Sequence, residues 1–172
     1  MRLFVAIDLP GELQDTIAGL QIPVRHLKWT PPEHLHITLQ FLGDQPDQRL
    51  PDIFEALETV EFEPMTLCCQ GIGQFRSGVI WLGIDQLPAL EQLQRRIQSA
   101  LRQVGIQGEQ RRFHAHVTLG RCDRHRLIPV LERVAEQFYG RSFRFDCDTF
   151  CLKSSILRPS GALHRVEALF GA

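Results

Sequence analysis

The chain has 172 residues, of which 44% are hydrophobic and 23% charged, and its formal net charge at pH 7 is −1. This composition excludes a disordered or collagen-like chain, and the length allows one domain to bury a core without disulfides. With a net charge near zero, the chain as a whole has no polycationic character, so any nucleic acid is expected to be held locally, as a short or terminal RNA, rather than along a broad basic face.

The cysteines and the first residues narrow the class of protein further. The five cysteines are odd in number and form no C-x-x-C motif, so the sequence indicates neither a disulfide framework nor a zinc knuckle, and we expect reduced thiols. In the opening segment MRLFVAIDLP, Asp8 and Pro10 interrupt an apolar run that is too short for a signal peptide or a membrane span. We therefore expect a cytoplasmic protein that does not enter a membrane.

Hydrophobic patterning predicts strands and helices in irregular alternation, which is typical of an α+β protein. In the first half, the predicted elements are a strand at 2–8, a helix from Pro10 to about residue 22, a short strand at 27–30, a strand at 34–42, a helix at about 47–60 and strands near 62–70 and 78–84. In the second half, they are a helix at 88–104, a strand at 113–121, a helix at about 127–138, a strand near 143–152 and a terminal strand around 163–170. The helix at 88–104 has the clearest pattern, because its apolar residues recur at helical intervals and a glycine follows them.

Two of the predicted strands carry almost the same string, HLHITL at 34–39 and HAHVTL at 114–119, 80 residues apart. Two copies exclude a solenoid and favour an ancient duplication that gives two facing lobes. Side chains alternate faces along a strand, so each string has a polar and an apolar face. In the first strand, the polar face carries His34, His36, Thr38 and Gln40, and the apolar face carries Leu35, Ile37, Leu39 and Phe41. In the second, the polar face carries His114, His116 and Thr118, and the apolar face carries Phe113, Ala115, Val117 and Leu119.

Paired histidines on polar strand faces suit acid and base catalysis. An unperturbed imidazole titrates near pH 6.5, so at neutral pH one histidine can accept a proton while another donates one. Displacement at phosphorus needs both groups, one on each side of the phosphorus atom. Thr38 and Thr118 lie two residues after their histidines on the same face, where their hydroxyls can bind phosphoryl oxygens. A single strand histidine is more often structural, but two matching strings are hard to assign to chance.

A metal site is the competing interpretation, because four histidines could be drawn together as ligands. Zinc and iron sites usually add a carboxylate or thiolate at a characteristic spacing, and the chain has no H-E-x-x-H or C-x-x-C motif. Glu33 is next to His34 in the chain and is predicted on the opposite face. We therefore expect no metal ion and no other cofactor.

The two strings resemble the H-x-T-x motifs of the 2H phosphoesterase superfamily, here His36-Ile37-Thr38-Leu39 and His116-Val117-Thr118-Leu119. The segments MRLFVAIDLP, WTPPEHLHITLQFLG, VIWLGI and FHAHVTLGR are similar to the RNA 2′,3′-cyclic phosphodiesterase branch, also called 2′-5′ RNA ligase-like. The resemblance extends over nearly the whole chain. It implies a bilobal α+β fold, a single domain over residues 1–172 with two pseudo-symmetric lobes of antiparallel sheet, helices outside and the active site in the cleft between the lobes.

The resemblance also implies a reaction. His36 matches the proton donor to the departing 3′ oxygen, and His116 matches the proton acceptor that activates water, so that the product carries a 2′-phosphate. Family members need no metal ion, and the reverse reaction joins RNA ends weakly through a 2′-5′ linkage. The expected substrates are RNA 3′ ends or small nucleotides that carry a 2′,3′-cyclic phosphate, and we expect the protein to act as a monomer.

Phe41 and Arg121, each five residues after its motif histidine, resemble residues that contact the terminal base. Simple alternation turns both side chains away from the histidines, so a bulge, for which Gly120 is a suitable place, would have to redirect them. For Phe41 the alternation favours packing in the core.

The remaining polar positions near the motifs are expected to have no catalytic part. His34 and His114 are expected to support the motif histidines or to lie at the surface. Gln40 stands where relatives frequently have a basic side chain. The histidines without a motif are assigned to the surface: His26, His125 and His164.

Two alternative functions stay open. The first is a related 2H enzyme that acts on another cyclic phosphate or on a 2′-5′-linked nucleotide. The second is an RNA-end-binding module whose histidines bind without catalysing. The intact H-x-T sequence in both halves argues against the second alternative, because a binding module has no need for two matched proton-transfer groups.

Overall fold

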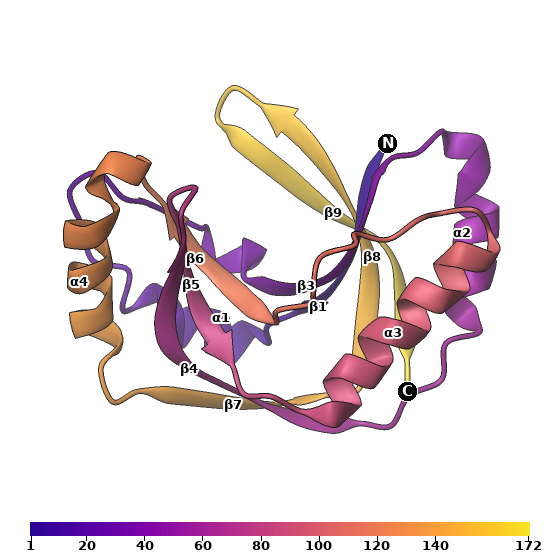
Figure 1. Ribbon diagram of the computed structural model, residues 1–172, viewed down its shortest axis with the longest axis horizontal. Helices are drawn as coiled ribbons and strands as arrows, with labels where there is room; N and C mark the ends of the chain where they lie inside the picture. Colours follow the sequence, from indigo (N-terminus) through magenta and orange to yellow (C-terminus); the bar gives the residue numbers. More distant parts are fainter.

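One antiparallel sheet of nine strands runs through the computed structural model, which describes residues 1–172 (Figure 1). The strand order is β7-β4-β5-β6-β3-β1-β8-β9, and β2 pairs with β6 beside this row. The strands are β1 (Arg2–Asp8), β2 (Lys28–Trp29), β3 (His36–Asp44), β4 (Met65–Phe75), β5 (Val79–Ile84), β6 (His116–Arg121), β7 (Ser142–Cys147), β8 (Thr149–Arg158) and β9 (Gly161–Gly171). The α-helices are α1 (Gly11–Ala18), α2 (Leu50–Glu58), α3 (Pro88–Gln103) and α4 (Leu127–Phe138), and three short 3-10 helices are η1 (Pro32–His34), η2 (Asp47–Arg49) and η3 (Arg124–Arg126).

The predicted α+β class is confirmed, and most predicted elements are present. The helix predicted at about 127–138 coincides with α4, and that predicted at 88–104 differs from α3 by one residue. Helix α1 ends at Ala18, earlier than predicted, because Gly19 and the approaching Pro23 disfavour its continuation. The strand predicted near 143–152 is two strands, since β7 pairs with β4 whereas β8 pairs with β1.

Both motif strands begin at their motif histidine, later than the patterning predicts. Residues 32–34, which follow Pro31, form the 3-10 helix η1, so β3 starts at His36 instead of at residue 34. Strand β6 starts at His116 instead of at residue 113. As a result, His36 and His116 lie at the first position of equivalent strands.

The sheet consists of two lobes that meet at these two strands. Lobe 1 contains β3, β1, β8 and β9, and lobe 2 contains β6, β5, β4 and β7. Along the chain, β1-α1-β3-α2 in the first half matches β5-α3-β6-α4 in the second. Between the lobes, the only Cα partners are Ile37 of β3 and Val117 of β6. The predicted arrangement of two pseudo-symmetric lobes is therefore confirmed.

The helices all lie on one side of the sheet. A single cluster of 36 buried apolar residues includes side chains of all four helices and of both lobes, for example Ile17, Ile53, Ile97 and Val134 from the helices. Helix α3 follows β5 of lobe 2 in sequence but contacts β3 of lobe 1 and helix α2, while α4 packs against β4 at the other end (Figure 1). The core thus extends across both lobes.

The other side of the sheet carries no helix. On β1, Leu3, Val5 and Ile7 enter the large core, whereas Phe4 and Ala6 point the opposite way and form a separate small cluster with Cys151. This separation follows from the alternation of side chains along β1. No helix in the structure combines the length and the apolar character that crossing a membrane requires.

Candidate active site

The two motif histidines lie on the same face of neighbouring strands. Ile37 and Val117 are Cα partners and both are fully buried in the core, so the residues on either side of them project from the opposite face. We call this surface the histidine face, and it carries His36, Thr38, His116 and Thr118. The antiparallel register sets His36 across from Thr118 and His116 across from Thr38, which makes the two histidines diagonal neighbours.

Diagonal neighbours on one face of an antiparallel pair are about 7–8 Å apart. Hydrogen bonds reach about 3 Å between heavy atoms, so one tetrahedral group between the two rings can contact both imidazoles. The structure therefore brings together the two residues that the repeated strings single out. Thr38 and Thr118 complete a set of two imidazoles and two hydroxyls around the same position.

The backbone fixes the tautomer of both histidines. The Nδ1–H of His36 donates to the carbonyl oxygen of His34 at 2.6 Å, and the Nδ1–H of His116 donates to the carbonyl oxygen of His114 at 2.8 Å. Because a carbonyl oxygen only accepts, Nδ1 carries the hydrogen in each ring, and Nε2 is the nitrogen that gains or loses a proton. His34 and His114 thus orient the motif histidines through their main chains, which any side chain at these positions would allow.

The Nε2 atoms of the two rings differ in their surroundings. His36 Nε2 lies 3.0 Å from the Thr38 hydroxyl oxygen, whereas no protein hydrogen-bond partner is recorded for His116 Nε2. Burial lowers the pKa of both imidazoles below 6.5, and the hydrogen bonds from Nδ1 oppose this effect. Nearby positive charge lowers the pKa further, from Lys153 at His36 and from His114 and Arg121 at His116. Both rings are therefore ready to accept a proton at neutral pH.

Lobe 1 adds a buried ion pair beside His36. Lys153 Nζ lies 2.7 Å from Asp8 Oδ1, and the lysine side chain is only 4% exposed. Asp8 is the Cα partner of His36 across β1 and β3, and its carboxylate raises the pKa of His36 while Lys153 lowers it. The sequence analysis missed this pair because the two residues are 145 positions apart and belong to no motif.

His164 of β9 was predicted at the surface, and that prediction is wrong. Its ring stacks on His34 with centroids 4.1 Å apart and an interplanar angle of 20°, and it meets the ring of His36 edge-on at 5.6 Å. Burial and the neighbouring His34 and His36 lower the pKa of His164 to about 4, so this ring is neutral at pH 7. The register of the β8–β9 hairpin, which pairs Ser155 with His164, brings it to the site. His26 and His125 are exposed, as predicted.

In lobe 2, His116 has aromatic rings and the positive charge of Arg121 nearby, but no ion pair. The Phe75 ring meets His116 edge-on, with centroids 5.0 Å apart, and the Trp81 ring lies 4.9 Å from that of His114. The residue across from His116 on β5 is Gly83, where lobe 1 has Asp8. Trp81 and Phe75 belong to no motif histidine strand, so the sequence pattern gives no signal that they lie at the site.

A bulge in β3 changes the faces of the residues that follow Thr38. The pairing with β1 skips Leu39, so Leu39 and Gln40 are both buried on the core side. Phe41 then returns to the histidine face, where it is 53% exposed and its ring lies 6.2 Å from that of Phe4. The expectation that Phe41 packs in the core is wrong, and so is the predicted place of Gln40 beside the histidines.

Strand β6 has the same bulge at the equivalent position. Its pairing with β5 skips Leu119, so Gly120 pairs with the buried Ile80 and the exposed Arg121 returns to the histidine face. A Cβ at Gly120 would lie 2.8 Å from the Leu27 side chain and 2.9 Å from a backbone oxygen, which explains the glycine. The prediction that a bulge near Gly120 redirects Arg121 is confirmed.

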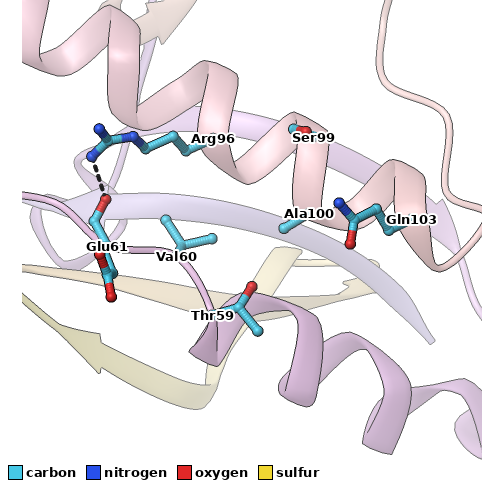
Figure 2. Close-up of a pocket in the computed structure, with 7 residues that line it drawn as sticks. All are labelled: Thr59, Val60, Glu61, Arg96, Ser99, Ala100 and Gln103. Atoms are coloured by element: carbon cyan, nitrogen blue, oxygen red, sulfur yellow. Dashed lines mark hydrogen bonds between the residues drawn. The ribbon is translucent and has the colours of Figure 1, made fainter.

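Two further observations delimit the site. No group of three or more histidine, cysteine, aspartate or glutamate side chains is arranged to hold a metal ion. A cavity of about 320 Å³ lies on the helical side, lined by the end of α2 and by α3, and in it Arg96 donates to the carbonyl oxygen of Glu61 at 2.7 Å (Figure 2). This cavity shares no residue with the histidine face, so we do not assign the chemistry to it.

Known proteins with this arrangement identify the family. The family model of the 2′-5′ RNA ligase superfamily matches residues 9–155. An RNA 2′,3′-cyclic phosphodiesterase of Archaeoglobus fulgidus is 31% identical, with 99% of each chain covered, and one of Thermus thermophilus is 30% identical, with 99% of this chain and 89% of the relative covered. The crystal structure of E. coli LigT complexed with 3′-AMP is similar with a TM-score of 0.84 at 27% identity, covering 99% of this chain and 97% of that one. The chain therefore belongs to the 2′-5′ RNA ligase superfamily of 2H phosphoesterases.

Proposed function

We propose that the protein hydrolyses 2′,3′-cyclic phosphate ends of RNA to 2′-phosphates, with His36 as the proton donor and His116 as the proton acceptor. The observation that carries the proposal is the juxtaposition of two imidazoles from different lobes, each with Nδ1 held by a backbone carbonyl, so that Nε2 is the nitrogen that transfers the proton. The names of the relatives and the 3′-AMP complex of E. coli LigT support RNA ends and nucleotides as the substrate class.

The proposed reaction uses one imidazole on each side of the phosphorus atom. His116 Nε2 takes a proton from water while the water oxygen forms a bond to phosphorus. The bond from phosphorus to the 3′ oxygen breaks, and protonated His36 delivers its Nε2 proton to that oxygen. The phosphate stays on the 2′ oxygen, and the two histidines have exchanged protonation states. Each proton transfer typically contributes about 10²- to 10⁴-fold to the rate.

The assignment of donor and acceptor is supported by the difference between the lobes. A donor must be protonated when the substrate is bound. Asp8, across from His36, favours the imidazolium, although burial and Lys153 each lower the pKa of His36 by more than Asp8 raises it. The negative charge of a bound phosphodiester favours it further. His116 faces Gly83 and aromatic rings, with no carboxylate opposite, which suits a neutral acceptor.

Four other side chains bind the substrate in this proposal. The hydroxyls of Thr38 and Thr118 donate hydrogen bonds to the non-bridging phosphoryl oxygens, where negative charge develops. The bulges return Phe41 and Arg121 to the histidine face, where they contact the terminal base. If a 5′-hydroxyl takes the place of water, the same groups form a 2′-5′ linkage, which is the weak ligation that the family resemblance implies.

The test is product analysis with an oligonucleotide that ends in a 2′,3′-cyclic phosphate. We expect a 2′-phosphate product, activity that persists in EDTA, and loss of about 10²- to 10⁴-fold in His36→Ala and His116→Ala. Circular dichroism should show that both variants remain folded. Binding without turnover would favour the RNA-end-binding module, and turnover only of other cyclic or 2′-5′-linked nucleotides would favour the related enzyme.

A further inference from the structure

An aromatic wall stands beside His116 on the histidine face of lobe 2. It consists of Phe75 at the end of β4 and Trp81 on β5, with ring centroids 5.8 Å apart. The Phe75 ring is edge-on to His116 at an interplanar angle of 89° and is 37% exposed. Neither side chain belongs to the core on the other side of the sheet.

The backbone of lobe 2 leaves room for this wall. The Trp81 ring lies against Gly73, its partner on β4, where a Cβ would come within 2.2 Å of the indole. A Cβ on Gly83, across from His116, would come within 2.8 Å of the Gln70 carbonyl oxygen, whereas its distance of 3.4 Å from the same ring is ordinary contact. Trp81 Nε1 makes no hydrogen bond, so packing alone holds the indole in place. Gly73 therefore allows a large ring on the face that carries the catalytic groups.

The fold itself does not require the wall, as the equivalent positions of lobe 1 show. Thr38 pairs with Ala6 in lobe 1, whereas Thr118 pairs with Trp81 in lobe 2. Phe75 is two positions after Gly73 on β4, and the position that matches it on β8 is Lys153. At these positions, the side of the donor histidine thus has Ala6 and Lys153, and the side of the acceptor histidine has Trp81 and Phe75. The rings that lie beside His36, those of Phe4 and His164, come from other positions.

We propose that the wall of Phe75 and Trp81 stacks the base of a second nucleoside, the one whose 5′ oxygen attacks or leaves the phosphorus beside His116. The inference rests on the proposed function, because His116 marks the side of the nucleophile only if it is the proton acceptor. A water molecule needs no aromatic surface at this position, whereas a nucleoside that carries a 5′-hydroxyl has a base to stack. The substrates that occupy both sides are 2′-5′-linked dinucleoside monophosphates.

The chemistry at this site balances. In cleavage of the 2′-5′ diester, the 3′ oxygen forms a bond to phosphorus and loses its proton to His36, while the bond from phosphorus to the 5′ oxygen breaks and His116 gives that oxygen a proton. The products are a 2′,3′-cyclic phosphate and a nucleoside with a free 5′-hydroxyl. Formation of the 2′-5′ linkage is the same step in reverse.

The experiment measures kcat/KM for three substrates: a 2′,3′-cyclic mononucleotide, a 2′-5′ dinucleotide, and the same dinucleotide with no base on the nucleoside that bears the 5′ oxygen. Base stacking on aromatic side chains is worth about 1–3 kcal/mol, which corresponds to about 5- to 150-fold in kcat/KM. We expect Phe75→Ala to lower the ratio of kcat/KM for the dinucleotide to kcat/KM for the cyclic mononucleotide by this factor. Phe75→Tyr should restore it, and Tyr139→Ala, which removes an aromatic ring that is 88% exposed elsewhere, should leave it unchanged.

The substrate without the base gives the decisive comparison. Removing the base should lower kcat/KM for the dinucleotide about 5- to 150-fold in the wild type. It should change kcat/KM very little in Phe75→Ala, because the stacking partner is already absent. The stacking site would be overturned if removal of the base lowered kcat/KM equally in the wild type and in Phe75→Ala. It would also be overturned if Phe75→Ala lowered kcat/KM equally for the dinucleotide and the cyclic mononucleotide. Failure of the wild type to hydrolyse the cyclic mononucleotide would instead overturn the proposed function.

Discussion

The buried ion pair beside His36 makes an asymmetric prediction about stability. Asp8→Asn leaves the Lys153 ammonium without its carboxylate at a side chain that is 4% exposed, whereas Lys153→Met leaves an aspartate that is 34% exposed and accessible to water. Removing one partner of a fully buried pair costs about 3–5 kcal/mol. The asparagine oxygen can still accept one hydrogen bond from Lys153, so we expect Asp8→Asn to lower the free energy of unfolding by about 2–4 kcal/mol. We expect Lys153→Met to lower it by about 1–2 kcal/mol.

Urea unfolding followed by circular dichroism measures both values, and for a chain of this length each kcal/mol corresponds to about 2–4 °C in Tm. The double variant Asp8→Asn/Lys153→Met should be more stable than Asp8→Asn alone, because the unpaired buried charge is gone. Arg165→Met is a matched control at a surface pair with a 4.0 Å separation, where we expect about 0–1 kcal/mol. If Lys153→Met destabilises the protein as much as Asp8→Asn, the reasoning from exposure is refuted.

Three further predictions concern the histidine face. Because burial holds the pKa of both imidazoles below 6.5, kcat/KM for a 2′,3′-cyclic mononucleotide should be highest on the acid side of neutrality and fall towards pH 8. The maximum of kcat should lie at a higher pH, because the bound anion raises both pKa values. A kcat/KM maximum above pH 7.5 would contradict this. Thr38→Val and Thr118→Val should each lower kcat about 10-fold or more while the unfolding midpoint changes little, and unchanged kcat values would remove the hydroxyls from the proposed mechanism. The pKa of His164 is about 4 in the folded protein, so the unfolded chain binds a proton first as the pH falls below 6.5. The free energy of unfolding should therefore decrease from pH 6.5 to pH 4, and its slope against pH should be smaller in His164→Phe. An identical slope in the variant would show that other groups cause the decrease.

The sequence was most informative where a pattern repeats within one strand. The string H-x-T-L was enough to predict which residues share a face at His36 and His116, because alternation holds without interruption across these three or four positions. The prediction from alternation was wrong beyond Thr38, because the bulge at Leu39 redirects the side chains of Gln40 and Phe41. Gly120 gave a signal for the bulge in the second strand, but β3 has Gln40 at the equivalent place and gives no such signal.

The parts of the site that the sequence could not predict come from distant strands. Asp8 meets Lys153, and His34 meets His164, only because β8 and β9 pair beside β1 in a particular register. That register depends on the division of one predicted strand into β7 and β8 at Asp148, where the chain leaves lobe 2 and enters lobe 1. Patterning along a single segment contains no information on such a change of partner.

The crossing of α3 from lobe 2 to the core of lobe 1 ties activity to the integrity of the entire molecule. One hydrophobic core extends across both halves, and the imidazoles come one from each half. A partly unfolded form that retains one half would separate the acid from the base. Loss of turnover in denaturant should therefore coincide with cooperative global unfolding, which makes enzymatic activity a direct reporter of the native population.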